Sequence, residues 1–134
     1  MSRLIGYGPG EISDRLSILS LKILHAPSDR DVSHFRVELA ALAAQLLERR
    51  TFSDSTSLGM AAKKLDQVNA RLWRLEDEMR TFRLVVVGQS DDWSNAREIA
   101  ICALEINALN AQRSELIAEI NRLAGHTGGP EKIR

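Results

Sequence analysis

The chain has 134 residues, of which 44% are hydrophobic and 27% charged, and 18 Lys and Arg residues balance 18 Asp and Glu residues, so the formal net charge is zero. This length predicts a single domain with a sizeable core, and the balanced charge shows no basic footprint for nucleic acid and no polybasic membrane signal. One cysteine, Cys102, excludes an internal disulfide and favours a reducing, cytoplasmic setting.

The composition favours helices, because Leu and Ala, with 18 and 15 residues, are strong helix formers. No apolar run approaches the roughly 18 residues that a transmembrane helix needs, so no membrane span is expected. We therefore predict an all-α protein in which residues 1–124 form one helical bundle and the Gly-rich residues 125–134 form a flexible tail.

The first two helices are predicted over about residues 9–25 and 30–50. Pro9 suits the first turn of a helix because its fixed backbone angle matches the helical one. The first helix is apolar on nearly all sides, which predicts a central position or a subunit interface. Ser28 or Asp29 is expected to cap the second helix, whose apolar residues recur every three or four positions.

Two longer helices are predicted over about residues 58–83 and 94–124. The first of these has an apolar seam in which every step is three or four residues: Leu58, Ala61, Leu65, Val68, Leu72, Leu75, Met79 and Phe82. The seam of the second is interrupted at its centre by Arg113. Four helices with short connections predict an antiparallel four-helix bundle.

Arg113 is a charge at a position that should be apolar. An unpaired guanidinium there costs several kcal/mol, so a carboxylate or an anionic ligand must meet it, and Glu76 and Asp14 are the internal candidates. Other polar groups occur on the same predicted helix faces. The full set of candidate ligand-binding or polar-core residues is Asp14, Lys22, Asn69, Trp73, Glu76, Asp77, Arg80, Asn107, Asn110 and Arg113.

The candidate residues allow three interpretations. In the first, the polar groups satisfy one another and set the register of the bundle. In the second, Arg113 with Arg80 and Lys22 binds an anion, while Glu76 or Asp14 transfers a proton or a hydrogen bond. In the third, the charges form a subunit interface. The three histidines lie in different segments, so neither a metal site nor a cofactor is predicted.

Three stretches resemble the signature motifs of a bacterial family classed as a domain of unknown function. They are GEISDRLSILSLKILH at 10–25, NARLWRLEDEMR at 69–80 and EINALNAQRSELIAEIN at 105–121. The residues that match the family pattern are Gly10, Glu11, Asp14, Arg15, Lys22, Asn69, Trp73, Glu76, Asp77, Arg80, Asn107, Asn110 and Arg113. The resemblance implies a role in the assembly of surface glycans and lipopolysaccharide, alongside glycosyltransferases, with no assigned reaction.

We thus expect a cytoplasmic helical bundle that binds an anionic sugar-linked or nucleotide-linked ligand near Arg113, Glu76 and Asp14. A homodimer through the surface of the first or third helix is expected as well. The alternative is a non-catalytic accessory protein with a protein partner, whose buried polar network is structural. A third hypothesis is an all-helical Mg²⁺-dependent nucleotide pyrophosphatase, which requires several converging carboxylates, and only Glu76 and Asp77 are close in sequence.

Overall fold

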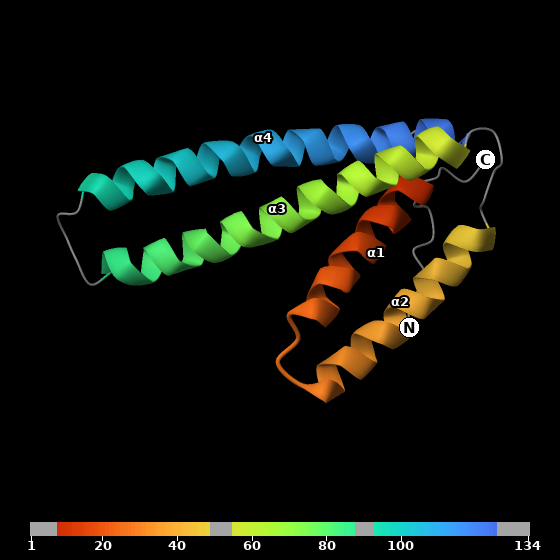
Figure 1. Ribbon diagram of the computed structural model, residues 1–134, viewed down its shortest axis with the longest axis horizontal. Helices are drawn as coiled ribbons and strands as arrows, with labels where there is room; N and C mark the ends of the chain where they lie inside the picture. The colour runs from red at the N-terminus through yellow and green to blue at the C-terminus, as the bar shows by residue number, and fades with distance from the viewer. Residues whose placement is uncertain (1–7, 49–54, 88–92, 126–134) are drawn as a thin grey trace.

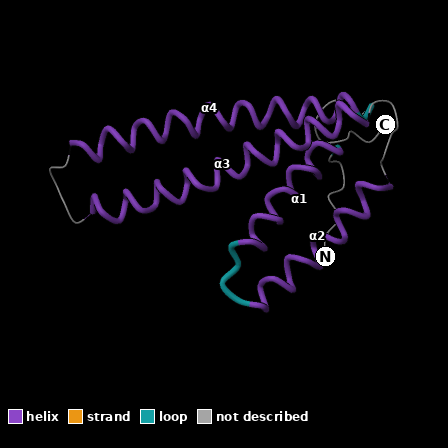
Figure 2. The backbone as a smooth tube through the Cα atoms, viewed as in Figure 1, coloured by secondary structure: helices purple, strands orange, loops and turns teal. Residues whose placement is uncertain are grey.

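The computed structural model describes residues 8–48, 55–87 and 93–125, and all regular structure in these ranges is α-helical (Figures 1 and 2). The four helices are α1 (Pro9–Leu24), α2 (Asp29–Glu48), α3 (Ser55–Val87) and α4 (Trp93–Leu123). The predicted all-α antiparallel four-helix bundle is confirmed.

The bundle consists of two antiparallel hairpins that meet at one end (Figure 1). The long helices α3 and α4 run side by side along their length, and the shorter pair α1 and α2 is inclined to them. In the part of the chain that the structure describes, α1 packs on all three other helices, whereas α2 packs on α1 alone. The central position predicted for the first helix is therefore confirmed.

The helix boundaries follow the predicted stop and start signals at most positions. Ser28 caps α2, since its Oγ accepts a hydrogen bond from the Asp31 backbone N–H at 3.3 Å and donates one to the Asp31 carboxylate at 2.8 Å. After α4, Gly125 adopts a φ of +77°, the left-handed conformation that ends many helices.

The third helix is longer than predicted at both ends, beginning at Ser55 and continuing to Val87. The prediction ended it near Arg83 because the following segment is β-branched. The preference of β-branched residues against helical conformation is weak, and no glycine or proline occurs between Arg83 and Gly88. The helical conformation therefore extends through the Val85–Val87 run.

The core consists of three clusters of buried hydrophobic side chains, each within one of the two hairpins. One lies between α1 and α2 around Ile12, Leu19 and Leu42. The other two lie between α3 and α4, where they bury the predicted seams, and their buried members are Ala61, Leu65 and Ile120 in one and Leu75, Met79 and Cys102 in the other. Each hairpin thus has its own apolar contact.

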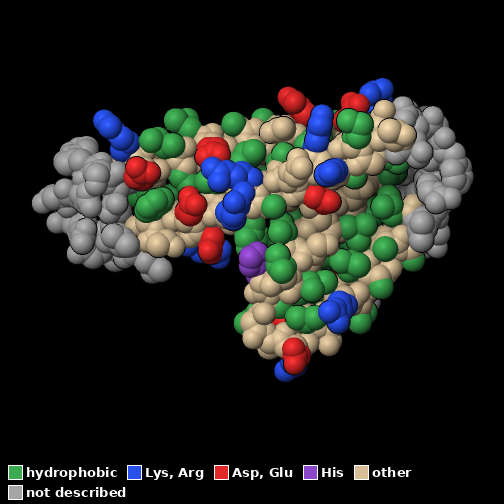
Figure 3. Space-filling view, viewed as in Figure 1, with side chains coloured by type: hydrophobic (Ala, Val, Ile, Leu, Met, Phe, Trp, Pro, Cys, Tyr) green, Lys and Arg blue, Asp and Glu red, His purple; other side chains and the backbone are tan. Residues whose placement is uncertain are grey.

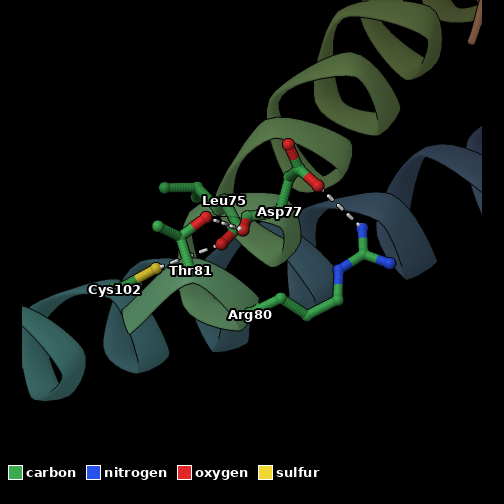
Figure 4. A network of polar contacts seen from close by, with 5 residues as sticks. All are labelled: Leu75, Asp77, Arg80, Thr81 and Cys102. Carbon is green, nitrogen blue, oxygen red and sulfur yellow. Dashed lines mark hydrogen bonds and ion pairs between the residues drawn. The ribbon is translucent and has the colours of Figure 1, made fainter. Parts of the chain in front are cut away.

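Cys102 occupies a buried position in the α4 seam. Burial raises the pKa of its thiol, and the carboxylates of Glu78 and Glu105 raise it further. The thiol donates a weak hydrogen bond to the Leu75 carbonyl oxygen at 3.4 Å (Figure 4). A raised pKa keeps the thiol in its protonated, weakly nucleophilic form near neutral pH.

The charged side chains visible on one face of the molecule are of both signs and are scattered over the helices (Figure 3). Among the described helices, none combines the length and the apolar character that crossing a membrane requires.

Candidate functional site

A partly buried ion pair joins α1 to α4. Arg113 donates from Nε to Asp14 Oδ1 at 2.8 Å and from Nη2 to Asp14 Oδ2 at 2.5 Å, in a bidentate arrangement. Asn69 of α3 donates to Asp14 Oδ1 at 2.9 Å. Of the two carboxylates considered for Arg113, Asp14 is therefore the one that meets it, and three helices contribute to the network.

The electrostatics of this pair favour a closed arrangement. The pKa of Arg113 is raised above its ordinary value, chiefly by the hydrogen bond with Asp14 and also by the negative charges of Asp14 and Glu76, while burial acts in the opposite direction. The side chain of Asp14 is only 10% exposed, against 32% for Arg113. An anionic ligand at Arg113 would have to use the remaining guanidinium N–H groups or displace the Asp14 carboxylate.

A second polar network fastens the start of α1 to the end of α4. The Gly10 N–H donates to Asn121 Oδ1 at 2.7 Å, and Asn121 Nδ2 donates to both carboxylate oxygens of Glu11 at 3.0 Å. Glu11 also accepts the Gly8 N–H at 2.9 Å, which closes the first turn of α1. This network satisfies backbone donors that a helix start otherwise leaves unpaired.

Sequence reasoning missed the role of Asn121, although a signal was present. Arg113, Ile117 and Asn121 follow one another at steps of four, so they lie on one face of α4. That face meets α1, because a Cβ added to Gly10 would come within 2.2 Å of the Ile117 carbonyl oxygen. The polar residues at 113 and 121 thus mark the α1 contact rather than an open pocket.

An open groove lies between α3 and α4, with a cavity volume of about 580 Å³. Its lining comes from both helices and consists of Trp73, Glu76, Met79, Arg80, Ala103, Ile106 and Asn107. Trp73 also stacks on His25 at the end of α1, with the ring centroids 5.1 Å apart and an interplanar angle of 15°. The stack places the inclined α1–α2 hairpin at one end of the groove.

Two polar residues that line the groove have side chains without a hydrogen-bond or ion-pair partner among the described residues. Glu76 and Asn107 are exposed, and neither makes a side-chain hydrogen bond or ion pair to another described residue. Arg80 has a partner, since it donates to Asp77 Oδ1 at 3.0 Å on the exposed surface of α3 (Figure 4). The groove therefore offers a carboxylate and an amide over an apolar floor.

The predicted polar set is thus divided between two places. Asp14, Asn69 and Arg113 form the buried network, and Trp73, Glu76, Arg80 and Asn107 line the groove, with Asp77 at its rim.

Lys22 and Arg80, which were predicted to join Arg113 in an anion site, make other contacts in the structure. Lys22 is directed to the α1–α2 contact, where its Nζ lies 5.7 Å from the centroid of the Phe35 ring. Arg80 bonds Asp77 instead. The structure therefore does not assemble Arg113, Arg80 and Lys22 into one cluster. Asn110 is exposed and is not among the residues that line the groove.

The pyrophosphatase hypothesis requires carboxylates that converge on a metal ion. Within residues 8–48, 55–87 and 93–125, no group of three His, Cys, Asp or Glu side chains lies where it could hold one.

Comparison of the chain with protein-family models, with curated proteins and with solved structures gave no match. The family resemblance accordingly rests on the three quoted motifs.

Proposed function

We propose that this protein is a binding protein, and that the groove beside Trp73 takes a sugar-linked ligand. The observation that carries the proposal is that Glu76 of α3 and Asn107 of α4, two polar side chains without a hydrogen-bond or ion-pair partner among the described residues, line the same groove as the Trp73 indole ring. The cavity volume of about 580 Å³ falls within the range of small-molecule sites.

The lining suits a molecule that carries hydroxyl groups on an apolar frame. A carboxylate accepts hydrogen bonds and an amide both donates and accepts, so Glu76 and Asn107 complement hydroxyls that do the same. Trp73, Met79 and Ile106 offer apolar surface for the carbon atoms of a ring. A sugar presents both kinds of surface.

The charges of the groove favour contacts to the sugar over contacts to an anionic group. Glu76 and Arg80 bring one charge of each sign, and Arg113 is occupied by Asp14. Arg80 remains the one lining group that can receive a linked phosphate, because its exposed pair with Asp77 contributes only about 0–1 kcal/mol and is easily exchanged. A nucleotide-linked sugar would therefore bind mainly through its sugar.

The proposal is tested by thermal unfolding with a panel of nucleotide sugars, the matching free nucleotides and inorganic phosphate. A ligand that binds only the folded state stabilises it by about 2.7 kcal/mol at a hundredfold excess over Kd. We expect a nucleotide sugar to raise Tm, and inorganic phosphate to leave it unchanged.

Paired variants locate the site. Asn107→Ala should abolish the ligand-induced rise in Tm, whereas Asn110→Ala, one turn further along α4 and outside the groove, should retain it. In a second pair, Glu76→Gln is the test variant and Glu78→Gln is its control, because both residues are exposed but only Glu76 lines the groove. A rise that survives Asn107→Ala, or no rise with any nucleotide sugar, would refute the proposal.

The second candidate function is a non-catalytic accessory protein whose polar residues are structural. The bidentate bond between Arg113 and Asp14 favours it, because both residues satisfy each other without a ligand. In that case no member of the ligand panel raises Tm, while loss of Arg113 lowers stability.

A further inference from the structure

The helix α4 carries a second heptad-like stripe on the side away from its core. Its members follow steps of four and three and are all exposed: Arg97, Ile101, Leu104, Ala108, Ala111 and Glu115. Ile101 is 54% exposed and Leu104 is 69% exposed, which places them among the most exposed large hydrophobic residues that the structure describes. Such a stripe is the pattern of a helix that packs on another helix.

No described helix covers this stripe. The seam of α4 that faces α3 contains Cys102, Ile106 and Ile120, and the face that meets α1 contains Arg113 and Asn121. The stripe lies on the opposite side, and α4 forms an outer edge of the molecule in Figure 1. Figure 3 shows hydrophobic side chains along that edge, with charged side chains towards either end.

We propose that the stripe is the interface with a second copy of this chain, packed antiparallel along α4. A two-fold axis that passes near position 106 places Leu104 of one copy opposite Ala108 of the other, and Ile101 opposite Ala111. Each large side chain then faces a small one, which lets the two helices approach closely.

The charges at the ends of the stripe specify both the partner and its orientation. The same axis places Arg97 of each copy opposite Glu115 of the other, so both ends of the seam gain an ion pair. Neither residue has an ion-pair partner among the described residues of its own chain. A parallel pairing would set Arg97 against Arg97 and Glu115 against Glu115, which is repulsive.

The residues that flank the stripe are compatible with this arrangement. Residues on the same flank of the seam meet across the axis, so Glu98 of one copy falls near Gln112 of the other, and Glu105 falls near Glu105 of the other. The charge of Glu105 is balanced within each copy by its ion pair with Arg71 at 2.9 Å. The apolar part is short, with two large side chains from each copy, which places the interface at the small end of specific interfaces. We therefore expect a dimer whose population depends on concentration in the micromolar range.

The experiment is sedimentation of the full chain over a concentration series, with circular dichroism to check the helical content. Leu104→Glu buries two carboxylates in the seam and should raise the dimer Kd at least about tenfold. The matched control is Leu24→Glu, because Leu24 is 75% exposed but lies at the end of α1. It should leave Kd unchanged.

A charge exchange tests the antiparallel register. Arg97→Glu and Glu115→Arg should each raise Kd about two- to fivefold, and the double variant should return Kd close to the wild-type value, because the ion pairs re-form with their signs exchanged. A chain that stays monomeric at all concentrations, or a dimer that Leu104→Glu does not weaken, overturns the proposal. Failure of the double variant to recover overturns the antiparallel pairing.

Discussion

At the scale of single residues, the surroundings of a charge decide whether it binds a ligand or holds the fold. Arg113 interrupts the apolar seam of α4 and is bonded at two atoms by Asp14, whereas Glu76 lies outside the apolar seam of α3 and is exposed beside the groove. Taking Arg113 from its partner leaves a mostly buried carboxylate, whereas Glu76 can be neutralised without such a penalty. We accordingly propose that Glu76 contacts the ligand, and we expect Arg113 to contribute to stability.

Arg113→Met should lower the free energy of unfolding by about 2–4 kcal/mol in urea, because Asp14 then keeps only Asn69 as a hydrogen-bond partner among the described residues. The double variant Asp14→Leu/Arg113→Met removes both charges and should recover part of that loss. Arg122→Met is the control, since Arg122 forms an exposed pair with Glu119 and its loss should cost at most about 1 kcal/mol. Equal losses for Arg113→Met and Arg122→Met would show that the buried pair is not structural.

At the scale of elements, the contact between α1 and α4 depends on a glycine. Gly10 lies directly against the backbone of α4, where its N–H bonds Asn121 and a side chain would collide with the Ile117 carbonyl. Gly59 of α3, in contrast, has no neighbouring atom within 4 Å of an added Cβ. The two glycines therefore have opposite roles, one required by close approach and one merely tolerated inside a helix.

Gly10→Ala should lower the free energy of unfolding by about 1–3 kcal/mol, because α1 must move away from α4 to admit the methyl group. Gly59→Ala should raise it by about 0.5–1 kcal/mol, since alanine is the better helix former in open space. Urea unfolding of the two variants measures both effects. A stabilising Gly10→Ala would contradict the close approach of the two helices.

At the scale of the whole molecule, the helices of the two hairpins differ in the number of neighbours that hold them in place. The α3–α4 hairpin has two core clusters and α1 bonded to it by both polar networks, whereas α2 contacts only α1 in the described part of the chain. Local opening of α2 therefore exposes one cluster, around Leu42, and leaves the remaining contacts intact.

Hydrogen exchange followed by mass spectrometry should reveal this difference. We expect the amides of α2, residues 29–48, to exchange faster than those at the centres of α3 and α4, at 65–79 and 102–120. The amides of α1 should be intermediate or slow, because three helices contact it. Equal protection in α2 and in the centre of α3 would mean that the bundle opens only as one unit.

Local sequence patterns were enough to predict the four helices and the faces that they bury. Apolar spacing of three and four residues is a local property of each helix, so the seams of α3 and α4 could be identified before any contact was known. The sequence also indicated that Arg113 needs a carboxylate or an anionic ligand, because an unpaired charge in an apolar seam is too costly. The C-terminal end of α3 was predicted too early in the sequence, since β-branched residues disfavour helix only weakly.

The side-chain contacts between helices follow from the tertiary structure and not from the pattern of any one helix. The choice of Asp14 over Glu76 for Arg113 depends on how α1 crosses α3 and α4. Lys22 lies instead beside Phe35 in the α1–α2 contact, and Arg80 pairs with Asp77 on α3 itself. The crossing of α1 is set by the close approach at Gly10 and by Asn121, which lie 111 positions apart in sequence. Helix periodicity records which face of a helix is buried, but it carries no information about the angle at which two helices cross.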